Sequence, residues 1–260
     1  MITKLDHVVI LVDDLPRAVE SYAACGFQVT PGGRHAAGTT HNALVPFADG
    51  AYLELIAFTR PDPSHRWWRH VAAGPGIIDF ALLPTDPAAD IEAARSRGVA
   101  LAGPIAGGRI RPDGVRLDWL MGIPEDPVLP FLCGDVTPRS LRVPGTAATA
   151  HSNTAEGVDE VVVVVDDLDA AARQYERLLG RPTPAPSVDE ALGASVRRLQ
   201  LGECALALVR PDRSADAALR ERLALRGPGP AAVALRAAAG RDWSRLDPEL
   251  TVGAVIYLRP

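Results

Sequence analysis

The chain has 260 residues, of which 47% are hydrophobic and 23% are charged. These proportions are those of a globular protein, and they exclude a wholly disordered or a fibrous chain. The formal net charge of −5 leaves no excess positive charge to bind phosphate groups, so we expect no nucleic-acid partner.

The cysteines and the N-terminal residues indicate the compartment. Cys25, Cys133 and Cys204 are far apart and form no CxxC pair, which is unlike a disulfide framework and fits a reducing environment. The apolar run at residues 8–12 is too short for a signal peptide or a membrane span. We therefore expect a cytoplasmic monomer or homodimer with no membrane partner, and the abundance of Ala and Arg favours a bacterial, GC-rich genome.

The chain begins with a unit that it later repeats. Residues 5–22 align without a gap with residues 158–175, and nine of the eighteen positions are identical. Each copy predicts a β-branched strand, an Asp-Asp turn able to cap a helix, and a helix with apolar positions three and four residues apart. Gly26 and Gly180 suit the ends of these two helices.

Further strands extend each copy to a βαβββ module. A fainter module begins at Ile77, with a helix that ends at Gly98, and a fourth, weakest module is indicated near the C-terminus. The segment 136–157 is rich in Pro, Ser, Thr, Ala and Gly and predicts a linker between two pairs of modules. The remaining strands that we predict cover residues 42–47, 52–58, 116–121, 128–133, 196–201, 204–209, 230–236 and 252–258.

Several of these motifs resemble a known family. The segments LDHVVILVDDL at residues 5–15 and YLELIAF at residues 52–58 resemble the vicinal oxygen chelate superfamily. GGRH at residues 32–35 and GTTHNALVPFADGAYLELIAF at residues 38–58 are similar to its glyoxalase-like domain branch, and the resemblance extends from residue 1 to about residue 144.

The resemblance implies a fold and a domain division. We expect an α+β fold of four βαβββ modules, paired into two half-barrel domains of the glyoxalase, bleomycin-resistance and dioxygenase type, with the last module degenerate. A glyoxalase-like domain at residues 1–140 would hold the cup for metal and substrate. A linker at residues 141–157 and a degenerate second domain at residues 158–260 would follow.

Three ionisable residues stand in otherwise apolar strands. Strand alternation places His7, Glu54 and Asp79 each on a face with apolar neighbours, and a buried carboxylate there needs a partner such as Arg, His or a metal ion. The resemblance puts His7 and Glu54 on metal-ligand positions of the first module and Asp79 on the matching first-strand position of the second. The fourth position falls near residues 131–133 and offers no carboxylate.

This ligand set predicts a divalent metal, and an alternative stays open. Mixed nitrogen and oxygen ligands suit Mg²⁺, Mn²⁺, Fe²⁺, Zn²⁺ or Ni²⁺, and no organic cofactor is expected. In that alternative the three residues are ordinary hydrogen-bonded core residues or edge residues. If the first module pairs with the fourth instead of the second, Asp79 leaves the cluster and the metal hypothesis falls with it. In the second half Glu160 replaces His7 and Leu206 replaces Glu54, so no metal site is expected there.

The neighbouring polar and aromatic residues predict a substrate site. Glu54 and His41 are the candidate catalytic groups, either as a base or to orient a polar substrate. The candidate substrate-binding residues are His35, Asn42, Tyr52, Trp67 and Trp119. Each of these residues also has an ordinary structural alternative, as a loop hydrogen-bonding group or as a packing residue.

Two main functions follow from these observations, beside a third in which the chain is a scaffold whose second half only completes an intramolecular pseudo-dimer. The first is a metal-dependent isomerase or lyase that polarises the oxygens of a small organic substrate, a dioxygenase being disfavoured because iron sites of that kind use two His and one carboxylate. The second is a metal-free protein of the same fold that binds a small molecule or confers resistance to it.

Overall fold

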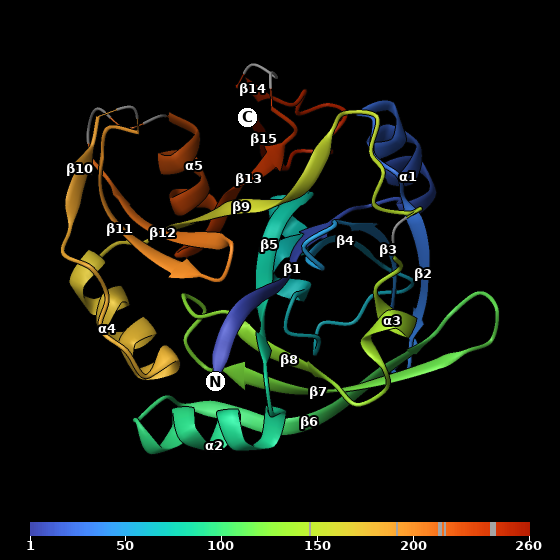
Figure 1. Cartoon of the computed structure of the whole chain (residues 1–260), viewed down its shortest axis with the longest axis horizontal. Helices are drawn as coiled ribbons and strands as arrows, with labels where there is room; N and C mark the ends of the chain where they lie inside the picture. The colour runs from blue at the N-terminus through green and yellow to red at the C-terminus, as the bar shows by residue number, and fades with distance from the viewer. Residues whose placement is uncertain (146, 191, 213–214, 216, 240–242) are drawn as a thin grey trace.

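Two β-sheets organise the chain in the computed structural model (Figure 1). The structure describes residues 1–145, 147–190, 192–212, 215, 217–239 and 243–260, so residue 146 of the predicted linker lies outside the described residues. The first sheet closes into a barrel in the order β1-β4-β3-β2-β6-β7-β8-β5. Its strands are β1 (Ile2–Leu11), β2 (Thr30–His35), β3 (Thr40–Pro46), β4 (Tyr52–Phe58), β5 (Gly76–Pro84), β6 (Leu101–Ile110), β7 (Arg116–Pro124) and β8 (Phe131–Asp135).

The barrel consists of the first two βαβββ modules. The first module contributes β1 to β4 and the second contributes β5 to β8, and antiparallel pairing of β1 with β5 and of β2 with β6 joins them. The first module therefore pairs with the second and not with the fourth, which was the point that the sequence left open.

The second sheet has seven strands in the order β10-β11-β12-β9-β13-β15-β14. Its fourth module is shorter than the others, because the described residues of that module form three strands, β13 to β15. The strands are β9 (Ala155–Val164), β10 (Ser187–Asp189), β11 (Ala194–Leu201), β12 (Cys204–Pro211), β13 (Gly229–Ala237), β14 (Ser244–Arg245) and β15 (Val255–Arg259). The predicted α+β class and the degenerate last module are confirmed.

The two helices of the internal repeat begin and end where the sequence indicates. Asp14 caps α1 (Leu15–Ala24) and Asp167 caps α4 (Leu168–Leu179), each through its carboxylate and backbone N–H groups of the first turn. Gly180 ends α4 in the left-handed conformation at φ 69°, which a residue without a Cβ adopts readily. The other helices are α2 (Pro87–Ser96), α3 (Arg139–Arg142), α5 (Ala217–Arg226) and the 3₁₀ helix η1 (Trp68–Ala73). None of the described helices is long and apolar enough to cross a membrane.

A shared core holds the barrel and the second sheet together. β13 lies against β5, and one cluster of buried side chains contains residues from both sheets. The two tyrosines of the internal repeat cross this junction in opposite directions. Tyr22 donates to the Thr251 carbonyl at 2.9 Å and Tyr175 donates to the Val128 carbonyl at 2.9 Å. The repeat therefore preserves a contact between the halves as well as a helix.

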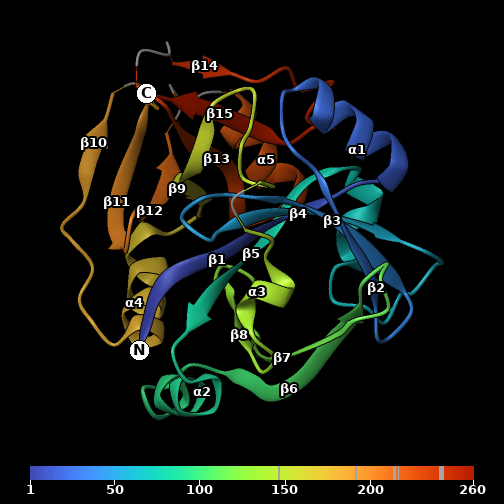
Figure 2. The same ribbon diagram turned by 45° about the vertical axis from the view of Figure 1, so that its right-hand side comes forward.

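Several elements of the structure were not predicted, among them α5 and the short strand β10. β2 and β6 were not predicted, because TPGGRH and the glycine-rich β6 lack the β-branched pattern of a strand; both gain partners through barrel closure. The predicted linker is also partly ordered, since it contains α3 and the start of β9 at Ala155. Figure 2 shows α3 beside β1 and β8 of the barrel.

Candidate functional site

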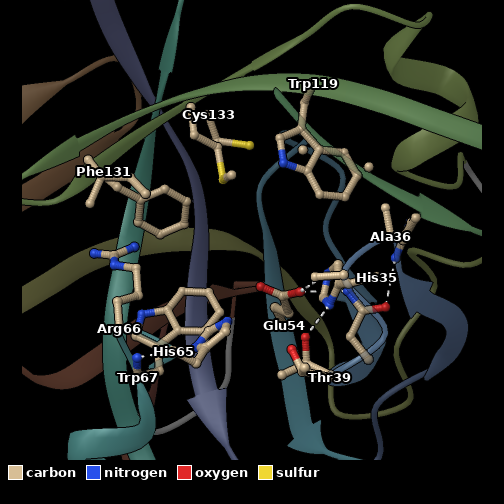
Figure 3. Close-up of a pocket in the computed structure, with 18 of the residues that line it drawn as sticks. His35, Ala36, Thr39, Glu54, His65, Arg66, Trp67, Trp119, Phe131 and Cys133 are labelled. Atoms are coloured by element: carbon tan, nitrogen blue, oxygen red, sulfur yellow. Dashed lines mark hydrogen bonds and ion pairs between the residues drawn. The ribbon is translucent and has the colours of Figure 1, made fainter. Parts of the chain in front are cut away.

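A cavity of about 460 Å³ lies inside the barrel. All five predicted substrate-binding residues line it, namely His35, Asn42, Tyr52, Trp67 and Trp119. Figure 3 shows His35 and Glu54 on one side of the cavity, with Phe131, Arg66 and Trp67 on the other. We call the first the polar side and the second the aromatic side, although Trp119 also lies near His35 and Arg66 lies beside Phe131.

Glu54 is the centre of the polar side. It lies in the middle of β4 and is 5% exposed. One carboxylate oxygen, Oε2, is 3.3 Å from His7 Nε2, and the other, Oε1, is 3.5 Å from His35 Nε2. Asn42 Nδ2 donates a further hydrogen bond to Oε1 at 2.5 Å. Two imidazoles and one amide therefore surround a single buried carboxylate.

The pKa of Glu54 reflects two opposing effects. Burial alone raises the pKa of a carboxyl group, but hydrogen bonds from His35 and His7 hold the pKa of Glu54 well below its usual range. Glu54 is therefore ionised at neutral pH. If one of these donors is removed, burial still favours the protonated form. The pKa of Glu54 then rises, and the carboxylate becomes a stronger base.

His7 lies between two carboxylates. Its Nδ1 is 2.7 Å from Asp6 Oδ2, while its Nε2 faces Glu54. Burial lowers the pKa of an imidazole, but the bonds to Asp6 and Glu54 outweigh burial and raise the pKa of His7. In the protonated form His7 has an N–H for each of these acceptors. Tyr52 stacks on the imidazole, with ring centroids 4.6 Å apart, and fixes its plane.

Asp6 is fully buried and is held by arginines from the predicted linker. Arg142 Nη1 donates to Asp6 Oδ2 at 2.7 Å, and Arg139 Nη1 donates to Oδ1 at 2.6 Å. Burial raises the pKa of Asp6, but Arg142, His7 and Arg139 together hold that pKa well below its usual range. The result is a continuous chain of charged groups that leads from α3 to Glu54.

Asp79 does not join His7 and Glu54. Its Oδ2 accepts from Trp67 Nε1 at 2.7 Å and pairs with Arg66 at 2.7 Å, while its Oδ1 accepts from the backbone N–H of Phe80 at 2.9 Å. Both oxygens are thus already bonded to donors of the aromatic side. Arg66 is therefore the charged partner of this buried carboxylate.

The predicted metal set therefore does not fit the structure. Among the described residues no group of three or more His, Cys, Asp and Glu side chains is arranged to hold a metal ion. The Nε2 atoms of His7 and His35 face opposite oxygens of Glu54, so the carboxylate itself occupies the space between the two imidazoles. At the fourth ligand position Cys133 faces Arg142, and burial raises the pKa of its thiol far above its usual value.

His41 is also not in place to act in the cavity. Side chains alternate along β3, and Thr40 and Asn42 line the cavity, whereas His41 is not among its lining residues. Burial, together with Arg34 and His35, lowers the pKa of His41. The predicted catalytic role of His41 is therefore not supported by its position, and His35 is the second histidine beside Glu54.

Several polar wall residues were not predicted, and three of them bear on the chemistry of the site. Arg109 on β6 and Arg142 on α3 come from segments without a hydrophobic period, and Thr39 precedes β3 in a tight turn. Gly32 of the GGRH motif gave an indirect signal. A Cβ at Gly32 would lie 2.0 Å from Asn42 Oδ1 and 2.4 Å from Arg109 Nη1, so only glycine allows this pair to lie against β2.

The second sheet corrects one assignment of the internal repeat. His7 pairs with Tyr52, and the equivalent Glu160 pairs with Ala205. Because Glu54 lies two residues beyond Tyr52, its equivalent is Ala207 and not Leu206. Leu206 points to the opposite face of β12, into the core shared with the barrel.

Residues 5–179 match a family model that is described as a glyoxalase-like domain. The chain belongs to this glyoxalase-like domain family. The match covers more than half of the chain, so the resemblance seen in the sequence is confirmed. No curated protein matches this glyoxalase-like protein.

Two solved structures share the fold of the glyoxalase-like protein. A hypothetical protein from Staphylococcus aureus is 16% identical, with each chain covered over 100% and a TM-score of 0.75. A mutant of 4-hydroxymandelate synthase from Streptomyces coelicolor is also 16% identical, with 90% of this chain and 71% of that chain covered and a TM-score of 0.61. These similarities show a shared vicinal oxygen chelate fold and do not identify a reaction.

Proposed function

We propose that this glyoxalase-like protein is an enzyme of the isomerase or lyase type that moves a proton on a small organic carbonyl compound. The observation that carries the proposal is the buried contact of 3.3 Å between His7 Nε2 and Glu54 Oε2 at the wall of the cavity. A protonated imidazole and an ionised carboxylate side by side supply an acid and a base at one place.

The roles of the two groups follow from their environments. When a substrate carbonyl enters the cavity, its oxygen competes with Glu54 for the N–H of His7. Glu54 then loses one of the bonds that depress its pKa, while burial continues to favour its protonated form. The substrate therefore converts a weak carboxylate base into a stronger one at the moment when a base is needed.

The proton transfer balances within the site. Glu54 takes a proton from the carbon next to the carbonyl, so a C–H bond breaks and an O–H bond forms on the carboxyl group. The electron pair of the C–H bond moves toward the carbonyl oxygen, where the His7 N–H stabilises the developing negative charge. Return of the proton to the same or to a neighbouring carbon gives exchange or isomerisation. No step is assigned to a metal, because the donors do not converge on one position.

Exchange of carbon-bound protons in deuterium oxide tests this proposal without a known net reaction. We would incubate untagged protein with small ketones, α-keto acids and hydroxyketones and follow the loss of the C–H signal by proton NMR. The wild type should exchange at least one compound, and Glu54→Gln should slow that exchange by about a hundredfold or more, the range of a general base. Glu160→Gln, at the equivalent position of His7 in the second sheet, is the matched control and should keep the activity.

Three results would decide against the proposal. Equal proton exchange by wild type and Glu54→Gln would show that Glu54 is not the base. Exchange that stops with a chelator and returns with a divalent ion, together with metal that is lost in Glu54→Ala, would restore the metal-dependent function. Tight binding of these compounds with no exchange would favour the metal-free binding protein.

A further inference from the structure

Two buried polar atoms of the cavity wall have no hydrogen-bond partner within the part of the chain that the structure describes. They are Nε of Arg109 and the hydroxyl oxygen of Thr39. Both residues line the cavity, and each is 4% exposed. Buried polar atoms are nearly always hydrogen-bonded, so two such atoms around one cavity indicate a ligand with polar groups.

Arg109 also differs in charge environment from the other arginines of the wall. Arg66 faces Asp79 at 2.7 Å, and Arg142 faces Asp6 at 2.7 Å. The hydrogen-bond partners of Arg109 are both uncharged: Nη1 donates to Asn42 Oδ1 at 3.0 Å and Nη2 donates to the Arg142 carbonyl at 2.8 Å. A buried guanidinium without a directly bonded carboxylate is costly, and an anionic ligand removes that cost.

We propose that Arg109 anchors the carboxylate of a small organic acid, which is the substrate class of this site. Nε of Arg109 donates to a carboxylate oxygen, and the Thr39 hydroxyl donates to the same ligand. This inference rests on the proposed function, which it deepens by naming the substrate class. One unpaired cation in the wall matches one negative charge, so a monocarboxylate fits better than a phosphate dianion.

The contacts of Asn42 place this carboxylate close to the base. Asn42 accepts from Arg109 through Oδ1 and donates to Glu54 through Nδ2, so a single side chain separates the anchor from the reacting group. A substrate bound at Arg109 therefore presents the carbon near its carboxylate to Glu54. The rest of the molecule lies toward the aromatic side of the cavity, where Trp67 and Phe131 form the wall.

Binding of phenylacetate and of its neutral isostere phenylacetamide tests the anchor directly. Isothermal titration calorimetry with the full chain should show the carboxylate binding about tenfold or more tightly than the amide, a difference of about 1.4 kcal/mol or more. Arg109→Gln should weaken phenylacetate binding to the level of the amide and leave the amide unchanged. Thr39→Val should weaken phenylacetate binding by a smaller factor, because it removes one uncharged donor.

Arg111→Gln is the matched control. Arg111 follows the same strand and pairs with Asp113, and it borders a second cavity of about 310 Å³ that Arg109 also borders. Arg111→Gln should bind phenylacetate like the wild type. If Arg111→Gln or Arg66→Gln lost phenylacetate binding while Arg109→Gln kept it, the anion would bind elsewhere, and the proposal would be overturned. Failure of wild type to prefer phenylacetate at millimolar concentrations would also overturn it.

The same titration separates this inference from the proposed function. Glu54→Gln removes a nearby negative charge and should bind phenylacetate at least as tightly as the wild type, even though it cannot act as a base. Carboxylate binding that depends on Arg109, without any proton exchange, would keep the anion site and reject the proposed enzyme activity. Proton exchange that depends on Glu54 but not on Arg109 would keep the proposed enzyme activity and reject the anion site.

Discussion

His7 in the barrel and Glu160 in the second sheet occupy equivalent positions of the internal repeat, but their surroundings differ. His7 lies between Asp6 and Glu54 and borders an open cavity. Glu160 is 4% exposed and pairs with Arg198 at 3.1 Å and Arg259 at 3.5 Å. The same strand position thus carries a His–carboxylate contact beside a cavity in one sheet and a closed ion-pair network in the other.

The connection that follows the fourth strand of the first and third modules differs between the two sheets. Between β4 and β5 the chain runs along the cavity rim, where Trp67 forms part of the wall before η1. Between β12 and β13 it forms α5, whose Leu219 and Leu223 pack against Val162 and Ala207 on the equivalent face. The apolar side chains of α5 therefore cover, in the second sheet, the face that borders the cavity in the barrel.

Removal of Arg142 should have the largest effect on stability. In Arg142→Leu the fully buried Asp6 keeps Arg139 and His7 but loses its most buried cation, and we expect the free energy of unfolding to fall by about 3–5 kcal/mol. Urea denaturation measures this change. Adding Asp6→Asn to Arg142→Leu should recover much of the loss, and a double variant that is less stable than either single variant would contradict the ion-pair explanation.

Arg198→Leu is the matched change in the second sheet. Arg198 is 40% exposed, and Glu160 keeps Arg259 after the substitution, so we expect a loss of at most about 1 kcal/mol. A loss as large as that of Arg142→Leu would mean that the two networks are equally buried and that the contrast between the sheets is false.

The packing of α5 on the second sheet can be tested by truncating one of its buried side chains, which should cost less stability than Arg142→Leu. Leu219 is 7% exposed, and Leu219→Ala should lower the free energy of unfolding by about 2–3 kcal/mol because it leaves a cavity beneath α5. Phenylacetate binding in the barrel should not change, which calorimetry on the same variant can check. Weaker binding would show that α5 also shapes the barrel site.

Much of the site could be predicted because it follows from strand alternation. His7 and Glu54 stand alone among apolar neighbours, and a two-residue period places both on the inner face of the barrel. Asp79 obeyed the same rule, but the residues that bond to it, Arg66 and Trp67, come from a rim segment whose path has no periodic signal. Sequence could show that Asp79 needs a partner and could not show which one.

Arg109 and Arg142 depend on long-range geometry that no local pattern contains. Arg109 reaches the wall only because β6 pairs with β2 across the closure of the barrel, and Arg142 only because the predicted linker folds back as α3. The assignment of Leu206 as the equivalent of Glu54 fails for a related reason. Pairing register depends on both strands, and an offset of one residue exchanges the inner face for the outer face.

The pH dependence of stability should give the smallest and most specific effect. The folded-state pKa of His7 is raised above its unfolded value, so its contribution is fully present below about pH 6.5 and is lost as the pH rises through the folded pKa. The free energy of unfolding should therefore fall on the alkaline side, by at most about 1.4 kcal/mol per pH unit for one proton. Urea denaturation at a series of pH values measures this slope.

His7→Gln isolates this slope from other titrations. The pKa values of His41, His65, His70 and His151 are lowered by burial, so these groups strengthen the fold as the pH rises through the acidic range and have no further effect above neutral pH. Burial also keeps Tyr52, stacked on His7, from ionising in this range by raising its pKa. His7→Gln should therefore be less stable than wild type at neutral pH but nearly free of the alkaline slope. A slope that persists in His7→Gln would show that His7 is neutral in the folded protein, and the acid of the proposed acid–base pair would be absent.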